Sequence, residues 1–376
     1  MMGVEPGEGP GDTEEGDSED ELTKEEAALR RQGKQPDAAG EAHTGSVTSL
    51  AVSPDSKWVA SGSDDTAIIL WDVEGQVMMA HRWPDAHREI VSDLAFSPDN
   101  RYLASAGGDS KIKIWDVDAR NDAPHAVLEG HTETIHTVLW SPDGTKLVSG
   151  SDDMTVRIWD AATFQQLHVL SSNAMVTFVI ISSDGTMLAS GGTDYNCRIW
   201  DVATGALRYD LRGHKGMVWT AAFDPECRRV ASGSDDGSVR IWRVSTGDEL
   251  VILHEHHGPV SSVAFSSDGK KILSASSDST VKVCDSFSGE KLLSLDGHDS
   301  MVNSARFSPD DRYIASASSD NTLRLWKTSD GSCVRTFNEH DDKVVQALFS
   351  SDGRLLSSGS DDGTVRIRVL SEWVQE

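Results

Sequence analysis

Residues 131–160 read HTETIHTVLWSPDGTKLVSGSDDMTVRIWD, and this stretch decides the fold. Related stretches recur to the end of the chain at a period of about 42 residues, and the first four close on Trp-Asp. Eight such units follow one another, and they start near residues 43, 87, 131, 172, 214, 256, 298 and 340. A constant period in this range indicates a repeat protein in which each unit forms one supersecondary structure.

Each unit has the pattern of paired β-strands. In the quoted copy, the apolar residues Ile135, Val138 and Trp140 precede the turn at residues 141–144, and a second apolar run follows it. Two-residue alternation interrupted by Ser-Pro-Asp-Gly is typical of a strand, a tight turn and a strand. Units of four strands cover both of their faces when they stack radially and close into a ring. We therefore predict an all-β fold, a single β-propeller over residues 43–376, with eight blades or, as the alternative, seven.

The repeats resemble the WD-repeat β-propeller family, and the resemblance covers residues 43 to about 370. In that family a His, a Ser, an Asp and a Trp of each unit form a buried hydrogen-bonded tetrad that stiffens the blade. The resemblance assigns this structural tetrad to five complete units: His43, Ser61, Asp65 and Trp71; His87, Ser105, Asp109 and Trp115; His131, Ser149, Asp153 and Trp159; His214, Ser232, Asp236 and Trp242; His298, Ser316, Asp320 and Trp326.

Three units depart from that tetrad. Ser172 replaces His in the fourth unit, Cys284 replaces Trp in the sixth, and Arg368 replaces Trp in the eighth. The Ser and the Asp are kept in all eight units, as expected for a carboxylate that accepts several hydrogen bonds at once. Ser, His and Asp also serve in hydrolases, but a catalytic site needs one exposed and activated hydroxyl. Eight copies therefore favour a packing role over catalysis.

Two further patterns invite a chemical interpretation. His254 and His257 flank the tetrad-register His256, but no further ligands lie nearby in sequence, so we predict neither a metal site nor a cofactor. A cation also stands two residues before the Trp position in seven units: Lys113, Arg157, Arg198, Arg240, Lys282, Arg324 and Arg366. This regular spacing favours stems packed between blades over a track for phosphates.

The two ends of the chain differ from the repeats. Residues 1–42 contain 13 acidic and 4 basic residues among Gly and Pro, which predicts a largely disordered acidic tail. A capping-box pattern at Thr23 and Glu26 predicts a short helix over residues 24–33 within that tail. The chain stops soon after the third strand of the eighth unit, and residues 35–40 are a poor candidate for its outer strand. We therefore predict a weak or three-stranded last blade.

Composition limits the classes of partner. The formal net charge of -27 disfavours nucleic acid and anionic membrane surfaces, which bind basic proteins. The four cysteines show no C-x-x-C spacing, and no apolar run approaches the roughly 20 residues that span a bilayer. We expect a cytoplasmic or nuclear protein without a disulfide framework.

The repeats differ most at positions that the resemblance places on the narrow rim of the channel. These positions lie three and five residues after the His, and directly before the tetrad Asp. Apolar residues gather there in units four to seven: Met175, Met217, Trp219, Pro259 and Met301, with Ile90 and His136 in earlier units. The acidic residues at the third position are Asp64, Asp152, Asp235 and Asp361. Neighbouring Met and Trp side chains predict a patch that a partner buries, and the alternative is that some of them plug the channel.

These patterns favour a non-catalytic scaffold or adaptor that presents a peptide- or domain-binding surface on the narrow face. We expect protein partners with neutral or basic segments, and no small-molecule substrate. The alternative is a subunit of a multiprotein machine, in signalling, ubiquitin-ligase substrate recognition, chromatin or RNA processing. An enzyme with a site at the channel mouth is less favoured, because no constellation of polar residues occurs only once.

Overall fold

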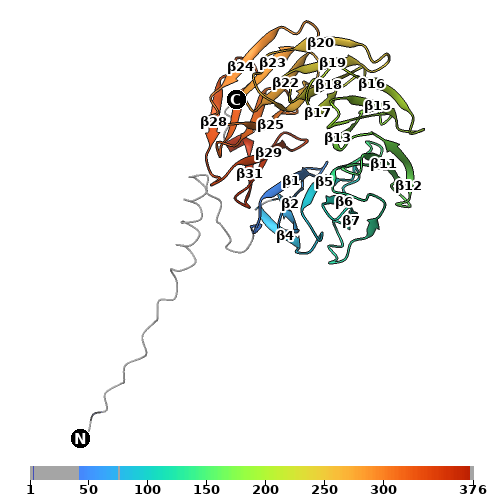
Figure 1. The fold of residues 1–376 in the computed structure, drawn as a ribbon. Helices are drawn as coiled ribbons and strands as arrows, with labels where there is room; N and C mark the ends of the chain where they lie inside the picture. Colours follow the sequence, from blue (N-terminus) through green and yellow to red (C-terminus); the bar gives the residue numbers. More distant parts are fainter. Residues whose placement is uncertain (1–2, 4–41, 75–76, 373–376) are drawn as a thin grey trace. The chain divides into compact units, whose positions relative to one another are not determined.

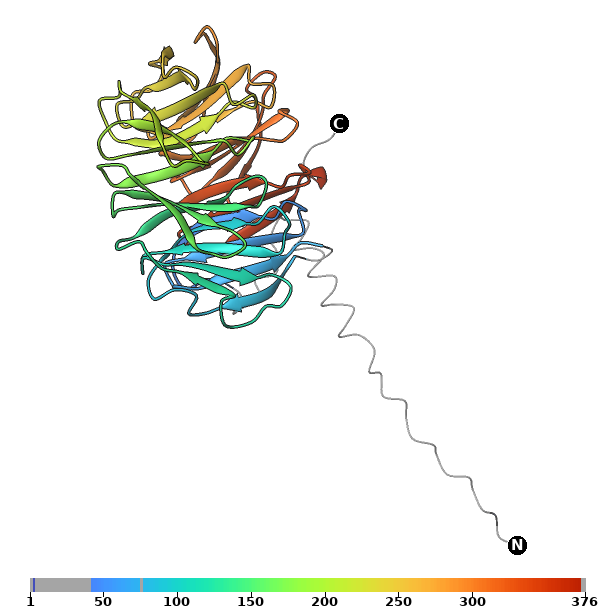
Figure 2. The same cartoon turned by 90° about the vertical axis from the view of Figure 1, so that its right-hand side faces the viewer.

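The computed structural model describes residue 3 and residues 42–74 and 77–372. The helix predicted over residues 24–33 and the stretch at residues 35–40 lie outside these ranges. The described chain forms eight antiparallel sheets in chain order, here called sheets one to eight, and one short 3-10 helix, η1 (Leu370–Glu372). Figure 1 shows the sheets following one another around a ring, and Figure 2 shows the same stack after a quarter turn.

The first strand of every sheet lies at the inside of the ring, because each first strand contacts the first strands of the two neighbouring sheets. These inner strands are β1 (Val47–Val52), β5 (Val91–Phe96), β9 (Ile135–Trp140), β13 (Val176–Ile181), β17 (Val218–Phe223), β21 (Val260–Phe265), β25 (Val302–Phe307) and β29 (Val344–Phe349).

The later strands of each sheet pair outward from the inner one. The second strands are β2 (Trp58–Ser63), β6 (Tyr102–Gly107), β10 (Lys146–Ser151), β14 (Met187–Gly192), β18 (Arg229–Ser234), β22 (Lys271–Ser276), β26 (Tyr313–Ser318) and β30 (Leu355–Ser360). The third strands are β3 (Ile68–Asp72), β7 (Ile112–Asp116), β11 (Thr155–Asp160), β15 (Cys197–Asp201), β19 (Val239–Arg243), β23 (Thr280–Asp285), β27 (Leu323–Lys327) and β31 (Val365–Val369). The outer strands are β4 (Met78–Trp83), β8 (Ala126–Leu128), β12 (Gln166–Ser171), β16 (Leu207–Leu211), β20 (Glu249–Leu253), β24 (Lys291–Asp296) and β28 (Cys333–Phe337).

The Ser-Pro-Asp-Gly turn joins the first and second strands, as the sequence predicts. Ser141 Oγ donates a hydrogen bond to Asp143 and accepts one from the backbone N–H of Lys146 at 2.9 Å. Gly144 closes the turn with a φ of 69°, a conformation that glycine adopts without steric cost. The hydroxyl thus fixes the turn from within, and the two strands leave it in register.

Neighbouring sheets pack face to face through apolar clusters. A glycine on the second strand makes room for a valine of the next sheet: a Cβ atom at Gly62 would lie 2.6 Å from Val91 Cγ1, which is too close for any side chain. The equivalent glycine of sheet five, Gly233, meets Val260 in the same way. The buried clusters therefore lie between consecutive sheets, and the core of the molecule is distributed around the ring.

The ring closes by packing sheet eight on sheet one. Gly359 of β30 lies under Val47 of β1, with the same spacing that separates other neighbouring sheets. Backbone N–H groups add to the junction, because Leu50 donates to Gln346 Oε1 at 2.9 Å and His43 donates to the carbonyl of Gly363 at 3.0 Å. Both views show the first and last sheets side by side (Figure 1, Figure 2). The eight-bladed prediction is confirmed, and among the described residues sheet eight has three strands.

Candidate functional site

In each regular tetrad, hydrogen bonds connect the loop that enters a sheet to the turn between the second and third strands of the same sheet. In sheet three, His131 Nδ1 lies 2.7 Å from Asp153, and its Nε2 lies 2.8 Å from Ser149 Oγ. Trp159 Nε1 donates to the same hydroxyl at 3.0 Å. The Asp153 carboxylate also accepts the backbone N–H of Thr132 at 3.2 Å. The network joins the loop that enters the sheet, the second strand and the third strand into one unit.

The electrostatics of the tetrad follow from burial. Burial lowers the pKa of His131 despite the opposing effect of Asp153, so the imidazole is neutral at pH 7. Burial alone would raise the pKa of Asp153, but hydrogen bonds from Thr155 and His131 outweigh it and hold the pKa below its usual range. In sheet seven the same balance brings the pKa of Asp320 to about 2. The carboxylate is therefore the charged, multiply bonded centre of each tetrad.

The seryl hydroxyls of the tetrads are buried. The set comprises Ser61, Ser105, Ser149, Ser190, Ser232, Ser274, Ser316 and Ser358. In the five complete tetrads the buried hydroxyl lies between a ring nitrogen and an indole N–H, an arrangement that favours packing over catalysis. The same His-to-Asp and His-to-Ser bonds occur in sheets six and eight, where His256 and His340 occupy the register that the sequence assigns to the tetrad His.

In sheet four Ser172 stands where other sheets have the tetrad His, and Arg198 bonds the tetrad Asp in place of the missing imidazole. The guanidinium pairs with both oxygens of Asp194, and its Nη1 donates to Ser172 Oγ at 3.2 Å. Trp200 Nε1 still donates to Ser190 Oγ at 2.8 Å. Since the arginine belongs to the predicted series of cations before the Trp position, one member of that series has taken over the bond that the imidazole makes to the tetrad Asp in other sheets.

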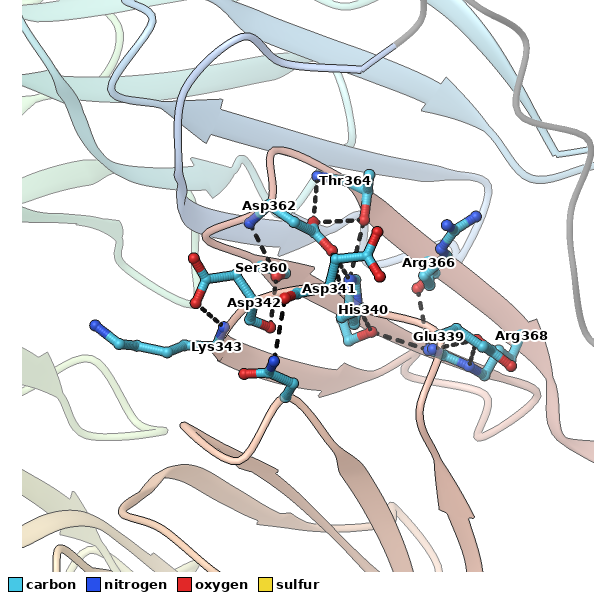
Figure 3. A network of polar contacts seen from close by, with 12 residues as sticks. Glu339, His340, Asp341, Asp342, Lys343, Ser360, Asp362, Thr364, Arg366 and Arg368 are labelled. Carbon is cyan, nitrogen blue, oxygen red and sulfur yellow. Dashed lines mark hydrogen bonds and ion pairs between the residues drawn. The ribbon is translucent and has the colours of Figure 1, made fainter.

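Arg368 fills the place of the missing Trp in sheet eight. Its Nη1 donates to Ser358 Oγ at 2.9 Å, the bond that an indole N–H makes elsewhere. Nε and Nη2 both donate to Glu339 Oε2, at 3.0 and 2.6 Å (Figure 3). Burial lowers the pKa of Arg368, and Glu339 opposes the shift. In sheet six the buried Cys284 supplies no such replacement, and Ser274 keeps its bond from His256 at 2.8 Å.

The other cations of the series have varied partners in or near their own sheets. Arg240 pairs with Glu249, Lys282 lies 3.7 Å from Asp296, and the amine of Lys113 donates to a backbone carbonyl. These contacts agree with the predicted role of stems packed between sheets with their charges near acids. His257 contributes its backbone N–H to Asp278 at 3.0 Å, as other residues after the tetrad His do.

The variable residues that the sequence singled out lie on the face of the ring that holds the tetrads, and this face keeps here the name narrow face that the resemblance gives it. It consists of the loops that enter the inner strands and the turns between second and third strands, which meet at the tetrads. Met175, Trp219 and Met301 are 41%, 42% and 46% exposed. Pro259 and His136 are also exposed, and Met217 and Ile90 are half-buried. The side chains of this set, here called the rim patch, are thus open to solvent or partly open.

The position five residues after the His has a second role that the sequence did not show. In sheets one, two, four, six and seven this side chain donates a hydrogen bond to a carbonyl of the next sheet: Thr48 to Val91, Ser92 to Ile135, Thr177 to Val218, Ser261 to Val302 and Asn303 to Val344. These five donors join neighbouring sheets, so Thr177 and Asn303 serve the ring and are not available as rim contacts.

His136 and Trp219 depart from this pattern. His136 Nε2 lies 2.8 Å from Asp152, and Trp219 Nε1 donates to Asp235 at 2.5 Å. Each carboxylate lies in the turn of the same sheet as the ring that it bonds, so each ring stands on the narrow face, and among the described residues neither ring makes a hydrogen bond to the next sheet. Two of the predicted rim residues are thereby brought together with two of the acids predicted beside them.

The opposite face holds features that the sequence interpretation missed. A hollow of about 700 Å³ is lined by Met187, Val244, Leu250 and Phe287, and another of about 610 Å³ lies near Tyr102. Beside the larger hollow, the buried Arg229 bonds Asp224 at 3.0 Å and stacks on Phe287 at 4.0 Å. The signal was present in sequence, because Asp224 replaces the Ser that opens this turn in the other seven units.

Comparisons with known proteins agree with this architecture. The family model described as WD domain, G-beta repeat matches residues 36–72, 81–116, 123–160, 164–201, 205–243, 247–285, 289–327 and 331–368. The crystal structure of the computationally designed Ika8 protein is similar with a TM-score of 0.77 and 29% identity, over 88% of this chain and 98% of that chain.

Two curated relatives match over short stretches. Protein HIR1 of Eremothecium gossypii is 49% identical over 47 residues, which are 12% of this chain and 6% of that protein. Protein HIR1 of Kluyveromyces lactis is 54% identical over 33 residues, which are 9% of this chain and 4% of that protein. The chain thus spans less than a tenth of the length of these relatives. Within the described ranges, no helix is long and apolar enough to cross a membrane.

Proposed function

Because this chain belongs to the WD domain, G-beta repeat family, we propose that it is a non-catalytic scaffold that binds a protein partner through the rim patch. The partner contributes a neutral or basic peptide segment with at least one apolar side chain. Partner and scaffold would meet in the cytoplasm or the nucleus. The observation that carries the proposal concerns Trp219. Its side chain is 42% exposed and bonds its own sheet, whereas the equivalent side chains of five other sheets donate a hydrogen bond to the next sheet.

The rim patch has the composition of a binding surface. An indole and several methionines on one face give apolar area with adaptable side chains, and such residues dominate the binding energy of protein interfaces. Met175, Met217 and Met301 lie at equivalent loop positions of sheets four, five and seven. Exposed apolar side chains at neighbouring positions favour a partner over a solvent-facing role.

The charge of the surroundings favours a basic partner. Asp152 and Asp235 lie beside His136 and Trp219, and the exposed Asp64 occupies the equivalent position of sheet one. A lysine or arginine of the partner can bond these carboxylates at the edge of the apolar patch. Such contacts raise the association rate and are weakened by salt.

Affinity capture with matched variants tests the proposal. The full chain, the Trp219→Ala, Met301→Ala double variant and a Leu292→Ala control serve as baits, since Leu292 is exposed on the outer strand β24, away from the patch. We expect proteins that the wild type and the control retain and the double variant loses. Binding of each retained protein should weaken about tenfold or more with Trp219→Ala alone.

Equal retention by all three baits would remove the rim patch from the binding surface. Circular dichroism and thermal unfolding of the double variant check that the ring is folded, so that a loss of binding can be assigned to the surface.

A further inference from the structure

The larger hollow on the face opposite the rim patch leaves apolar surface uncovered. Its volume is about 700 Å³, and the apolar residues of its wall are Met187, Val244, Leu250, Val251 and Phe287. Phe287 is 65% exposed, more than any other large apolar side chain of the described residues, and Leu250 is 38% exposed. A concave site with an exposed phenyl ring and an exposed leucine on its wall has the shape and the chemistry to receive an apolar group.

A buried arginine holds one wall of this hollow in place. Arg229, at the start of β18 in sheet five, donates from Nε to Asp224 at 3.0 Å. Its Nη1 donates to Ser286 Oγ at 2.9 Å, and its Nη2 donates to the carbonyl of Gly269 at 2.6 Å, both in sheet six. The guanidinium carbon lies 4.0 Å from the ring centroid of Phe287. The phenyl ring is thus supported from below, and the hollow is a built feature of the junction between two sheets.

The residues of this junction occur in no other unit. Asp224 replaces the Ser that opens the turn in the other seven units. The positions equivalent to Arg229 hold no arginine: Trp58, Tyr102, Lys146, Met187, Lys271, Tyr313 and Leu355. Ser286 stands where sheets one to five have valine or alanine. The three polar residues bond one another across the junction, so the hollow does not follow from the repeat itself.

The mouth of the hollow carries a cation without a partner. Arg243 lines the hollow and is exposed, and among the described residues its guanidinium makes no hydrogen bond or ion pair. The equivalent residues of five other sheets are acidic: Asp72, Asp116, Asp160, Asp201 and Asp285. An arginine therefore reverses the charge at this position, and a carboxylate of a partner can accept its paired N–H donors.

The acids that line the hollow are bonded within the chain. Asp224 accepts the buried guanidinium described above, and the Glu226 carboxylate bonds Arg228 at 2.9 Å. Asp184 accepts the hydroxyl of Ser182 at 2.6 Å in its own turn. These carboxylates do not pair with the exposed guanidinium at the mouth, so the charge that complements the hollow is negative.

We propose that the larger hollow binds a peptide segment of a partner protein in which a large apolar side chain stands next to an acidic one. The apolar side chain packs against Phe287 and Leu250, and the carboxylate pairs with Arg243. The rim patch on the other face favours neutral or basic segments. The two faces therefore select partners of opposite charge, which lets one scaffold hold two different proteins. This inference makes no use of Trp219 and does not depend on the function proposed for the rim patch.

Fluorescence anisotropy with three labelled peptides tests the site. The first peptide has a Leu between Glu residues and is completed with Gly and Ser, the second has Gln for Glu, and the third has Ser for Leu. The full chain is compared with Arg243→Glu and Phe287→Ala. Lys327→Glu is the matched control for charge, because Lys327 is the exposed equivalent of Arg243 in sheet seven. Leu292→Ala is the control for apolar area, since Leu292 is exposed and lies outside the hollow.

We expect the wild type to bind the first peptide more tightly than the other two. Affinity for the first peptide should fall about tenfold in Phe287→Ala and about fivefold or more in Arg243→Glu, while both controls and Trp219→Ala bind as the wild type does. Arg243→Glu should leave the weaker binding of the Gln peptide unchanged, because that peptide has no charge to repel. Since both substituted side chains are exposed, the variants should fold, and thermal unfolding checks this.

The proposal is overturned if the wild type does not bind the first peptide, or if Arg243→Glu and Lys327→Glu bind it equally well. It is also overturned if the wild type self-associates in analytical ultracentrifugation and Phe287→Ala does not, because the occupant of the hollow would then be a second copy of this chain.

Discussion

Sheets three and four solve the same structural problem with different residues. Sheet three ties its Asp153 to a neutral imidazole, His131. Sheet four lacks that imidazole and ties Asp194 to the buried guanidinium of Arg198. The carboxylate is common to both, and its partner varies. The comparison teaches that the carboxylate in the turn needs a side-chain donor that is long enough to reach it. An imidazole and a guanidinium both meet this need.

The first prediction concerns the carboxylates, where the largest effect is expected. Asp194→Ala should lower the free energy of unfolding by about 3–5 kcal/mol, because it leaves the guanidinium of Arg198 buried without its main partner. Asp153→Ala should cost less, about 2–3 kcal/mol, since it leaves a neutral imidazole and backbone N–H groups unpaired. Urea unfolding monitored by tryptophan fluorescence measures both. A larger loss for Asp153→Ala would reverse the comparison.

The second prediction contrasts the two sheets without a tetrad Trp. Arg368→Ala in sheet eight removes the donor to Ser358 and leaves Glu339 without its guanidinium, so stability should fall by about 3 kcal/mol. Cys284→Ala in sheet six removes a small buried side chain and should cost about 1 kcal/mol. Equal losses in the same urea experiment would show that Arg368 is a space filler and not a substitute for the indole.

The third prediction uses pH. Burial raises the pKa of Asp93 from 3.8 to about 6, against the hydrogen bonds from Val138 and Leu94. A carboxyl whose pKa is higher in the folded state binds protons more tightly there, so its charged form costs stability above pH 6 and this cost disappears as the pH falls toward 4. The wild type should therefore gain about 1 kcal/mol relative to Asp93→Asn between pH 7 and pH 5.

The pH experiment is a difference measurement, because the tetrad residues titrate in both proteins. Burial lowers the pKa of the tetrad histidines, so the stability that they contribute is lost on acidification. This loss is the same in both proteins and cancels in the comparison. A constant difference between wild type and Asp93→Asn across this range would contradict the assignment.

The fourth prediction separates residues that join sheets from residues of the rim patch, and its effect on stability is the smallest. Thr177→Ala removes the donor to the carbonyl of Val218 and should cost about 1 kcal/mol. Trp219→Ala removes an exposed ring that makes no bond to the next sheet, and should change stability by less than about 0.5 kcal/mol. Thermal unfolding of the two variants side by side checks the order.

The sequence predicted the repeated parts of the molecule and missed what occurs once. The eight units placed the eight sheets, and the turn residues and the tetrads recur in most of these units, so each signal was read several times. The sequence also placed the irregular tetrads, but it could not tell that Arg198 and Arg368 would reach into the empty places. That outcome depends on side-chain reach across strands, which a one-dimensional pattern does not contain.

The rim positions were the harder case. Alternation along a strand could not separate Thr177, which bonds the next sheet, from Trp219, which stands on the narrow face. At this position the hydroxyl of Thr177 reaches the next sheet, whereas the larger indole of Trp219 bonds its own sheet and is available for other contacts. Asp93 was missed for a similar reason, since a single charge on an inner strand breaks no repeat.

The central claim is that exposed side chains of the rim patch, which do not join neighbouring sheets, select the partner. The most direct test measures the affinity of one captured partner for the wild type, Trp219→Ala and Thr177→Ala under the same conditions. The account predicts that Trp219→Ala weakens binding about tenfold or more while Thr177→Ala binds as the wild type does. Unchanged affinity of Trp219→Ala, with the ring folded, would contradict it.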